Sequence, residues 1–296
     1  MKRYRHAPTG LALVRAGLAI AATLSPAMAA RWAYRLWFVT RVRAESAAAR
    51  DALAVSQRSI VEADGVPLAV YCRGEGPVVL LVHGWSGRGS QFAALAGALA
   101  NAGYRAVAFD APAHGRTPGR RTDIFEIAAA VNHLASRLGR IHAVVSHSFG
   151  GTCLALALRE GLSCGRAVCI SPPATLAWMV ASFGDMLNLS EATREGLWEL
   201  LERRFGPDVD ARISTDMNAR FLSQPALVLH DEDDEDVPWQ QGAMVARAWP
   251  RARFERTRGL GHRRILSDAD VVRRVVEYVG AESIAEASWP APALAG

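Results

Sequence analysis

The residues that are best suited to carry out a chemical reaction surround a serine in the segment 146–151, which reads SHSFGG. Apolar residues precede this segment and an alanine- and leucine-rich stretch follows it, as when a strand turns directly into a helix. Such a turn places its central residue, Ser148, at the end of a sheet with the hydroxyl exposed. Strand and helix crowd together there, and Ser146 and Gly150 supply the small residues that this requires. Ser148 is therefore a candidate nucleophile, although a serine that only caps the helix would show the same local pattern.

A serine hydroxyl becomes an effective nucleophile only when a nearby base accepts its proton. The candidate base is His262, which ends the glycine-rich segment GLGH at 259–262. An acid that orients the imidazole is expected in the run of six acidic residues at 231–236, directly after a predicted strand. A surface histidine and a solvated acidic loop are the structural alternatives. Together, Ser148, His262 and one of these acids could transfer an acyl group from an ester to water.

The elements that must position these residues are short apolar runs separated by helical stretches. We expect strands at residues 66–71, 78–82, 106–109, 143–146, 167–170, 226–230 and 252–256, and helices at residues 91–101, 123–138, 149–160 and 268–279. Strands that alternate with helices need crossover connections, which give a parallel sheet with helices on both faces. The sequence therefore predicts an α/β fold with a mainly parallel, doubly wound sheet.

The segment at about 172–221 interrupts this alternation, because it contains helical stretches at 175–188 and 190–205 but no clear strand. Ligands of open parallel sheets bind beyond the carboxyl ends of the strands, which favours a helical lid over the site rather than a decoration of the sheet edge. Apolar side chains of this segment could line an acyl pocket or form the segment's own packing face: Trp178, Met179, Phe183, Met186 and Trp198.

The first 58 residues form a basic, partly apolar segment with no acidic residue before Glu45. Its apolar run at 16–30 is too short to span a bilayer and contains Ser25-Pro26, a favourable start for a helix. We expect this helix either to pack on the globular domain or to contact a membrane peripherally, which would place the protein in the cytoplasm at the inner membrane face. Small residues near Ala29 resemble a signal cleavage site and would make the protein periplasmic, but the arginines that follow oppose export.

Composition excludes several classes of protein. Half of the 296 residues are hydrophobic, which excludes a mainly disordered chain, and long apolar runs in series are missing, which excludes a multi-span membrane protein. The net charge is +5, and the arginines beyond the first fifty residues are scattered, so we expect no nucleic-acid partner. The four cysteines show no metal-ligand spacing, and we expect no metal site. A single globular domain is expected at 59–280, followed by a loose tail at 281–296.

From about Val66 to Val279 the chain resembles the α/β-hydrolase superfamily. The family's base motif, G-x-G-H, is met in full at 259–262. The family's nucleophile elbow, G-x-S-x-G, is met except that Ser146 replaces the first glycine. The chain order serine, acid, histidine also matches the family's catalytic triad.

The acid loop of the family often reads G-x-x-D-x-x-V-P. Asp231 stands in the glycine position of this chain, which places the acid of the triad at Asp234. Asp236 is the alternative if the loop register slips, and Asp233 is the weaker candidate.

Two further loops carry the resemblance. The segment HGW at 83–85 resembles the family's oxyanion loop, which implies an oxyanion hole formed by the backbone N–H groups of Trp85 and Phe149. The segment DAPAHG at 110–115 resembles the family's D-x-P-G-H-G loop, in which we expect Asp110 and His114 to be structural.

The resemblance implies a serine esterase that forms an acyl-enzyme intermediate on Ser148, with His262 as base and Asp234 as orienting acid. Such a reaction needs no metal or organic cofactor, and its partner is a small-molecule ester or acyl substrate. A serine nucleophile disfavours the dehalogenase and epoxide hydrolase chemistry of this superfamily, which uses aspartate. Two alternatives stay open: a non-catalytic or membrane-associated binding protein on the same scaffold, and cofactor-free acyl transfer or perhydrolysis.

Overall fold

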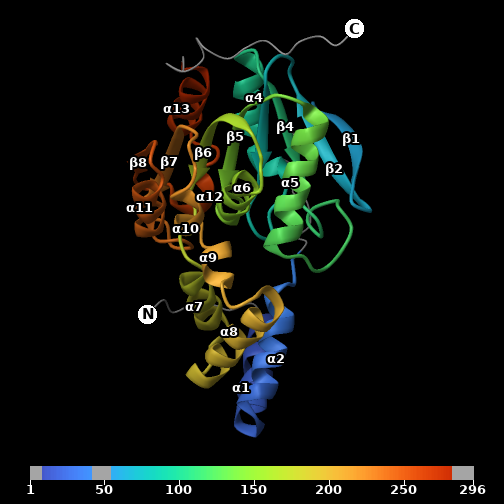
Figure 1. Ribbon diagram of the computed structural model, residues 1–296, viewed down its shortest axis with the longest axis vertical. Coiled ribbons are helices and arrows are strands. Elements are labelled where there is room, and N and C mark those ends of the chain that lie inside the picture. The colour runs from blue at the N-terminus through green and yellow to red at the C-terminus, as the bar shows by residue number, and fades with distance from the viewer. Residues whose placement is uncertain (1–8, 42–54, 282–296) are drawn as a thin grey trace.

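A computed structural model describes residues 9–41 and 55–281 of the chain. Its centre is an eight-stranded sheet in the order β1-β2-β4-β3-β5-β6-β7-β8 (Figure 1). The strands are β1 (Gln57–Ala63), β2 (Val66–Arg73), β3 (Val78–Val82), β4 (Arg105–Phe109), β5 (Ile141–His147), β6 (Cys164–Ile170), β7 (Ala226–Asp231) and β8 (Ala252–Thr257). Every strand that the sequence predicts is present, and β3 has the predicted bounds.

The sheet is parallel from β4 to β8 and antiparallel at one edge, where β2 pairs with β4 and β1 pairs with β2. The mainly parallel α/β fold is confirmed. β1 is absent from the prediction, because most of its residues are exposed and polar and give no apolar run. Asp64 and Gly65, both with positive φ, form the two-residue turn of the β1–β2 hairpin, as the twist of paired strands favours.

Both faces of the sheet are buried, as the continuous apolar run of β3 predicts. Leu80 and Val82 pack into the core on one face, and Val79 and Leu81 pack into the core on the other. The first face is covered by α5 (Ile124–Leu138), α6 (Phe149–Arg159) and α11 (Trp239–Ala248), and the second by α4 (Ala93–Asn101) and α13 (Ala269–Gly280). Two short helices, η1 (Gly89–Phe92) and α12 (Gly261–Arg264), lie in loops.

The segment between β6 and β7 is helical, as predicted. It forms α7 (Leu176–Leu187), α8 (Glu191–Phe205), α9 (Val209–Ile213) and α10 (Thr215–Ala219). Two N-terminal helices, α1 (Thr9–Leu24) and α2 (Pro26–Trp37), lie beside α7 and α8 at one end of the molecule (Figure 1). We name this four-helix group the helical cap.

The start of α2 is the one that the sequence predicts. Ser25 caps the helix and Pro26 occupies its first position. α2 packs along α8, so one of the two predicted settings of this helix, packing on the globular domain, is present. In the described part of the chain, no helix combines the length and hydropathy that crossing a bilayer requires. The predicted tail at 281–296 lies outside the described residues from residue 282 onward, and the predicted boundary between residues 58 and 59 falls within β1.

Candidate functional site

Ser148 occupies the turn between β5 and α6, where its backbone is in an unusual conformation. Its φ of 54° and ψ of −129° are strained for a residue with a side chain. The strain persists because both sides are fixed. The N–H of Ser148 donates to the carbonyl of Ile170 at 2.8 Å, and a Cβ at Gly150 would lie 2.4 Å from the carbonyl oxygen of Val82. The small residue after the turn is therefore required by the approach of α6 to the end of β3.

Ser146, which replaces a glycine of the family pattern, is accommodated without disturbing this turn. The residue is fully buried, and its hydroxyl donates to the carbonyl of Val168 on the neighbouring strand at 3.1 Å. The nearest approach of α6 leaves room for it, since even a Cβ at Gly151 would stay 3.6 Å from Ser146 Oγ.

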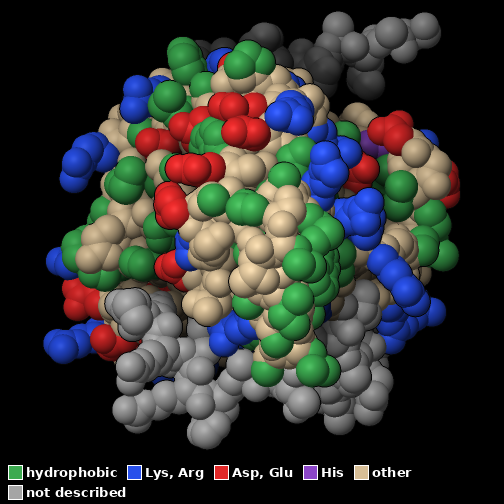
Figure 2. Space-filling view, turned by 90° about the horizontal axis from the view of Figure 1, so that it is seen from below, with side chains coloured by type: hydrophobic (Ala, Val, Ile, Leu, Met, Phe, Trp, Pro, Cys, Tyr) green, Lys and Arg blue, Asp and Glu red, His purple; other side chains and the backbone are tan. Residues whose placement is uncertain are grey.

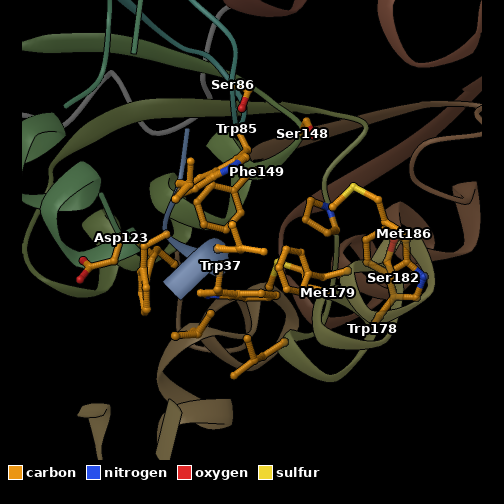
Figure 3. Close-up of a pocket in the computed structure, with 18 of the residues that line it drawn as sticks. Trp37, Trp85, Ser86, Asp123, Ser148, Phe149, Trp178, Met179, Ser182 and Met186 are labelled. Carbon is orange, nitrogen blue, oxygen red and sulfur yellow. The ribbon is translucent and has the colours of Figure 1, made fainter. Parts of the chain in front are cut away.

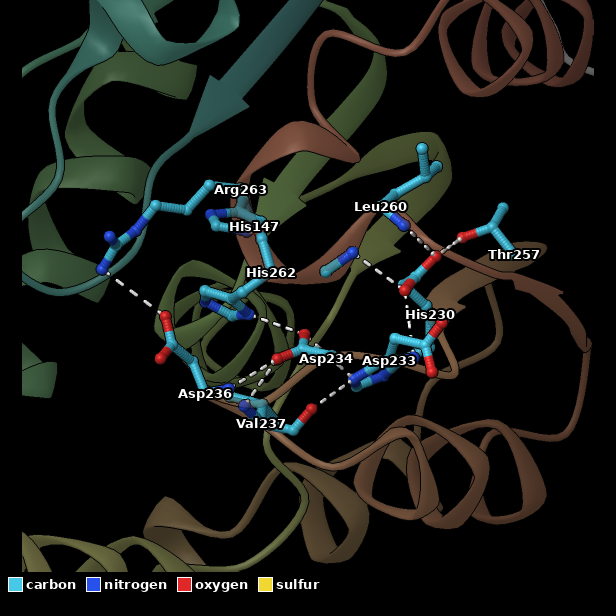
Figure 4. A network of polar contacts seen from close by, with 12 residues as sticks. His147, His230, Asp233, Asp234, Asp236, Val237, Thr257, Leu260, His262 and Arg263 are labelled. Carbon is cyan, nitrogen blue, oxygen red and sulfur yellow. Dashed lines mark hydrogen bonds and ion pairs between the residues drawn. The ribbon is translucent and has the colours of Figure 1, made fainter. Parts of the chain in front are cut away.

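The imidazole of His262 is paired with Asp234. Nδ1 of His262 donates to Asp234 Oδ2 at 2.7 Å (Figure 4). Oδ1 of the same carboxylate accepts the N–H groups of Asp236 and Val237 at 2.9 and 2.8 Å, so both of its oxygens are held. Asp236 itself is exposed and faces Arg263 at 3.5 Å. Of the acids that the sequence leaves open, the one beside the imidazole is thus Asp234.

The environment of Asp234 keeps its carboxylate charged. Burial alone would raise the pKa of Asp234, but hydrogen bonds from His230 and His262 outweigh burial and hold this pKa well below the usual range. His230 is fully buried and lies 3.5 Å from Asp234 Oδ2, while its Nε2 donates to the carbonyl of Val237 at 2.9 Å. The result is an anionic acid ready to stabilise a protonated His262.

His147, the last residue of β5, links His262 to the end of this strand. Nε2 of His147 donates to the carbonyl oxygen of His262 at 2.8 Å, and the two rings lie 4.6 Å apart. Burial lowers the pKa of His147 to about 3, so this ring is neutral. Ser148 Oγ makes no hydrogen bond with any residue that the structure describes. Hydrogen bonds between catalytic groups are often long in the absence of substrate. The backbone of His262 is held by His147, which directly precedes Ser148 in the chain.

Asp231 fixes the loop in which His262 lies. Its fully buried carboxylate accepts the N–H groups of Leu260 and Gly261 at 3.1 and 2.8 Å, and the hydroxyl of Thr257 at 2.7 Å. It also accepts the N–H of Asp233 at 3.0 Å, which joins the histidine loop to the acid loop. Burial alone would raise the pKa of Asp231, but these hydrogen bonds lower it overall. The residue that departs from the family's glycine therefore clamps both loops.

The loop after β3 approaches Ser148 closely through Gly84. A Cβ at Gly84 would lie 2.8 Å from the Cβ of Ser148, so only glycine allows this contact. Trp85 follows, and its ring meets that of Phe149 at 5.3 Å. Phe149 is the first residue of α6, where a helix leaves N–H groups without intrahelical acceptors. The two predicted donor residues thus flank Ser148.

Two histidines hold this loop. His83 Nε2 accepts the N–H of Ala111 at 3.0 Å, and His114 Nε2 accepts the N–H of Ser86 at 2.9 Å. Burial lowers the pKa of His83 to about 4 and that of His114 to about 3, which suits neutral acceptors. Asp110 accepts the N–H of Gly89 at 2.7 Å. These contacts agree with the structural role expected for Asp110 and His114.

A cavity of about 420 Å³ opens beside Ser148 (Figure 3). Trp85 and Phe149 line it near the serine, and the four predicted pocket residues of α7 line its other wall: Trp178, Met179, Phe183 and Met186. Trp198 is not among the lining residues, and its Nε1 donates to Glu202 at 2.9 Å. The apolar residues of the inserted segment therefore fall into two groups: those of α7 line the cavity, and Trp198 of α8 lies outside it.

The N-terminal helices form part of the same cavity wall, which sequence reasoning misses. Val14 of α1 and Leu36 and Trp37 of α2 line it, and the Trp37 ring meets Phe183 of α7 at 5.0 Å. No local signal could place residues 14–37 beside residues 176–187. The clamp by Asp231 is also missed, although its place in the family's loop pattern marks it as unusual.

A metal site is not apparent in residues 9–41 and 55–281, where no three His, Cys, Asp or Glu side chains are grouped to hold an ion.

Comparison with known proteins identifies the fold and the family. Similar structures include an esterase from Exiguobacterium antarcticum (17% identity, TM-score 0.60, covering 76% of this chain and 100% of that one). A meta-cleavage product hydrolase from Pseudomonas fluorescens IP01 is 20% identical (TM-score 0.57, 74% and 96% covered). An epoxide hydrolase from Vigna radiata is 17% identical (TM-score 0.58, 77% and 98% covered). At these identities the likeness concerns the fold alone.

None of the curated proteins matches the chain. The sequence pattern of the alpha/beta hydrolase family matches residues 79–275, which is most of the chain and includes the segments of Ser148, Asp234 and His262. The chain therefore belongs to the alpha/beta hydrolase family.

Proposed function

We propose that the protein is a serine hydrolase that cleaves a carboxylic ester through Ser148, His262 and Asp234. The observation that carries the proposal is the 2.7 Å hydrogen bond from His262 to the buried Asp234, with His262 tethered to the residue before Ser148. An imidazole held in this way has one nitrogen committed to the carboxylate and the other free to accept a proton.

The reaction begins when His262 Nε2 accepts the hydroxyl proton of Ser148 and Oγ attacks the ester carbonyl carbon. Asp234 stabilises the imidazolium that forms, and the N–H groups of Trp85 and Phe149 bind the oxyanion. Loss of one such donor typically lowers turnover by about 10²–10³. The alcohol leaves with the proton from His262. Water, activated by the same imidazole, then attacks the acyl-enzyme and releases the acid.

The substrate that fits best is an ester with an apolar acyl or alcohol group. The cavity beside Ser148 is lined mainly by aromatic and aliphatic side chains from α1, α2 and α7. Such a surface binds apolar groups by removing them from water, at about 25 cal/mol per Å² of apolar surface buried. The similar structures include an esterase, an epoxide hydrolase and a meta-cleavage product hydrolase, so the fold alone does not select the bond that is cleaved. The serine nucleophile favours the ester.

The test measures hydrolysis of p-nitrophenyl esters of increasing acyl length. We expect turnover that rises with acyl length until the cavity is filled, and a loss of at least about 10³-fold in Ser148→Ala with unchanged circular dichroism. Ser136→Ala, which removes an exposed hydroxyl on α5, is the matched control and should keep full activity. Undiminished turnover in Ser148→Ala would remove Ser148 from the mechanism. A folded wild type that hydrolyses none of the esters would favour a binding protein.

A further inference from the structure

The outer side of the N-terminal helices carries a large apolar surface. Leu13, Ile20 and Leu24 of α1 are 70%, 63% and 74% exposed, and Met28 and Trp32 of α2 are 45% and 37% exposed. The spacing of the three α1 residues places them on one face of the helix. Figure 2 shows hydrophobic side chains gathered over this end of the molecule, with basic side chains along one border. We name these five residues the outer apolar face.

α1 is apolar on its inner side as well. Leu11, Leu18 and Ala21 of the same helix are buried. Arg15 is the one charged residue in α1, and its Nε donates to the carbonyl of Met186. A helix that is apolar on all sides is normally covered on all sides, and exposed apolar patches of this kind mark interaction sites. The outer apolar face therefore requires an apolar partner.

The charge around this face favours a partner with anionic groups. The first 44 residues contain eight of the 34 basic residues and none of the 29 acidic ones, so the rest of the chain has a net charge of −3. Arg31 and Arg35 are exposed on α2 and follow the apolar residues Met28 and Trp32 by three positions each, about one helical turn. The exposed acidic residues of the helical cap, such as Glu191 and Glu195, lie on α8 instead. An apolar surface flanked by arginine matches a bilayer with anionic headgroups.

We propose that the outer apolar face and the arginines of α2 dock the protein on the surface of an anionic lipid bilayer. The helices lie in the interface and do not cross it. Docking rests on this surface and is independent of catalysis. One consequence rests on the proposed function: since Val14, Leu36 and Trp37 of the same helices line the cavity, docking places the cavity wall next to the lipid, from which an apolar ester can enter.

The test is co-sedimentation of the full-length protein with vesicles of phosphatidylcholine alone and of phosphatidylcholine with phosphatidylglycerol. We expect stronger binding to the anionic vesicles, and weaker binding as salt is added. The triple variant Leu13→Gln, Ile20→Gln, Leu24→Gln should bind both vesicles at least about tenfold more weakly, because it removes exposed apolar surface without changing charge. The double variant Arg31→Gln, Arg35→Gln should lose about 30-fold on anionic vesicles only.

The matched control is Ile60→Gln, which removes an equally exposed apolar residue (72%) from β1. It should bind both vesicles like the wild type. Wild-type protein that sediments with neither vesicle, or a triple variant that binds like the wild type, would overturn the proposal. A wild type that is dimeric without lipid, and that the triple variant makes monomeric without any vesicle binding, would show that a second copy covers the face. Ester hydrolysis in solution is measured separately, so failure of docking and failure of catalysis are distinguishable.

Discussion

At the scale of single residues, Asp231 does what the glycine of the family's loop pattern cannot do. Its carboxylate holds N–H groups of the histidine loop and of the acid loop at once. Because the position of His262 depends on both loops, we expect Asp231 to act in the proposed reaction as a positioning residue that touches no reacting atom.

Asp231→Ala should lower kcat for an activated ester by up to about 100-fold and change KM little, since small misplacement of a catalytic group is costly while the cavity is untouched. Asp231→Asn, which keeps one acceptor oxygen, should retain more activity than Asp231→Ala. Glu235→Ala removes an exposed acid of the same run and serves as the control. Equal kcat in Asp231→Ala and Glu235→Ala would show that the hydrogen bonds of Asp231 to the two loops do not affect catalysis.

Because His262 pairs with Asp234 and not with Asp236, we expect variants of these two acids to differ in activity. Asp234→Asn should reduce kcat by about 10³–10⁴-fold, because the amide neither holds the productive tautomer nor stabilises the imidazolium. Asp236→Asn breaks only an exposed ion pair with Arg263 and should stay within a few-fold of the wild type. Steady-state kinetics of both variants on one ester decides the matter, and the reverse order of effects would assign the role to Asp236.

At the scale of elements, α2 and α8 pack through small residues. Ala29 and Ala30 of α2 are buried, and a Cβ at Gly196 of α8 would lie 2.8 Å from the Cβ of Ala30. This close packing seats the N-terminal helices so that Trp37 reaches the cavity. Ala29 is also where a signal cleavage would fall, and cleavage there would remove the first turn of α2 and the whole of α1, whose Val14 lines the cavity.

Ala30→Leu should lower the free energy of unfolding by about 1–3 kcal/mol, because the larger side chain overpacks the seam between α2 and α8. Ala27→Leu adds the same atoms at an exposed position of α2 and should change the free energy of unfolding by no more than about 0.5 kcal/mol. Urea unfolding of the two variants makes the comparison. Identical midpoints would mean that the contact between α2 and α8 accommodates a larger side chain, and that the small residues there are not needed to position α2.

The elements differ in how far the sequence predicts them, for physical reasons. β3 is fully predicted because all five residues are apolar, and α5 begins after Asp123, whose side chain caps it. The order of motifs predicts which loops hold Ser148, Asp234 and His262. The part of the cavity wall formed by α1 and α2 is not predictable in this way, because it brings residues 14–37 beside α7, which is distant in the sequence. An acidic run resembles a solvated loop, which hides the buried setting of Asp231.

At the scale of the whole molecule, three buried histidines make stability depend on pH. Burial lowers the pKa of His83 from 6.5 to about 4, and those of His114 and His147 to about 3. The unfolded chain binds these protons below pH 6.5, whereas the folded protein does not bind them until the lower values are reached. The folded state therefore keeps this stability above pH 6.5 and loses it progressively as the pH falls.

We expect the free energy of unfolding to fall between pH 6.5 and about pH 4, by up to about 1.4 kcal/mol per pH unit for each neutral histidine. Urea unfolding over this range measures the slope. A free energy that stays constant over the range would contradict the neutral, buried state of these rings.

The central claim is that Ser148 is the nucleophile, and labelling with a serine-directed fluorophosphonate tests it most directly. The account predicts one adduct per chain, located by peptide mapping on Ser148, absent in Ser148→Ala, and slowed at least about 10²-fold in His262→Ala because the hydroxyl then lacks its base. Ser136→Ala should label like the wild type. An adduct on another residue, or equal labelling of Ser148→Ala and the wild type, would contradict the account.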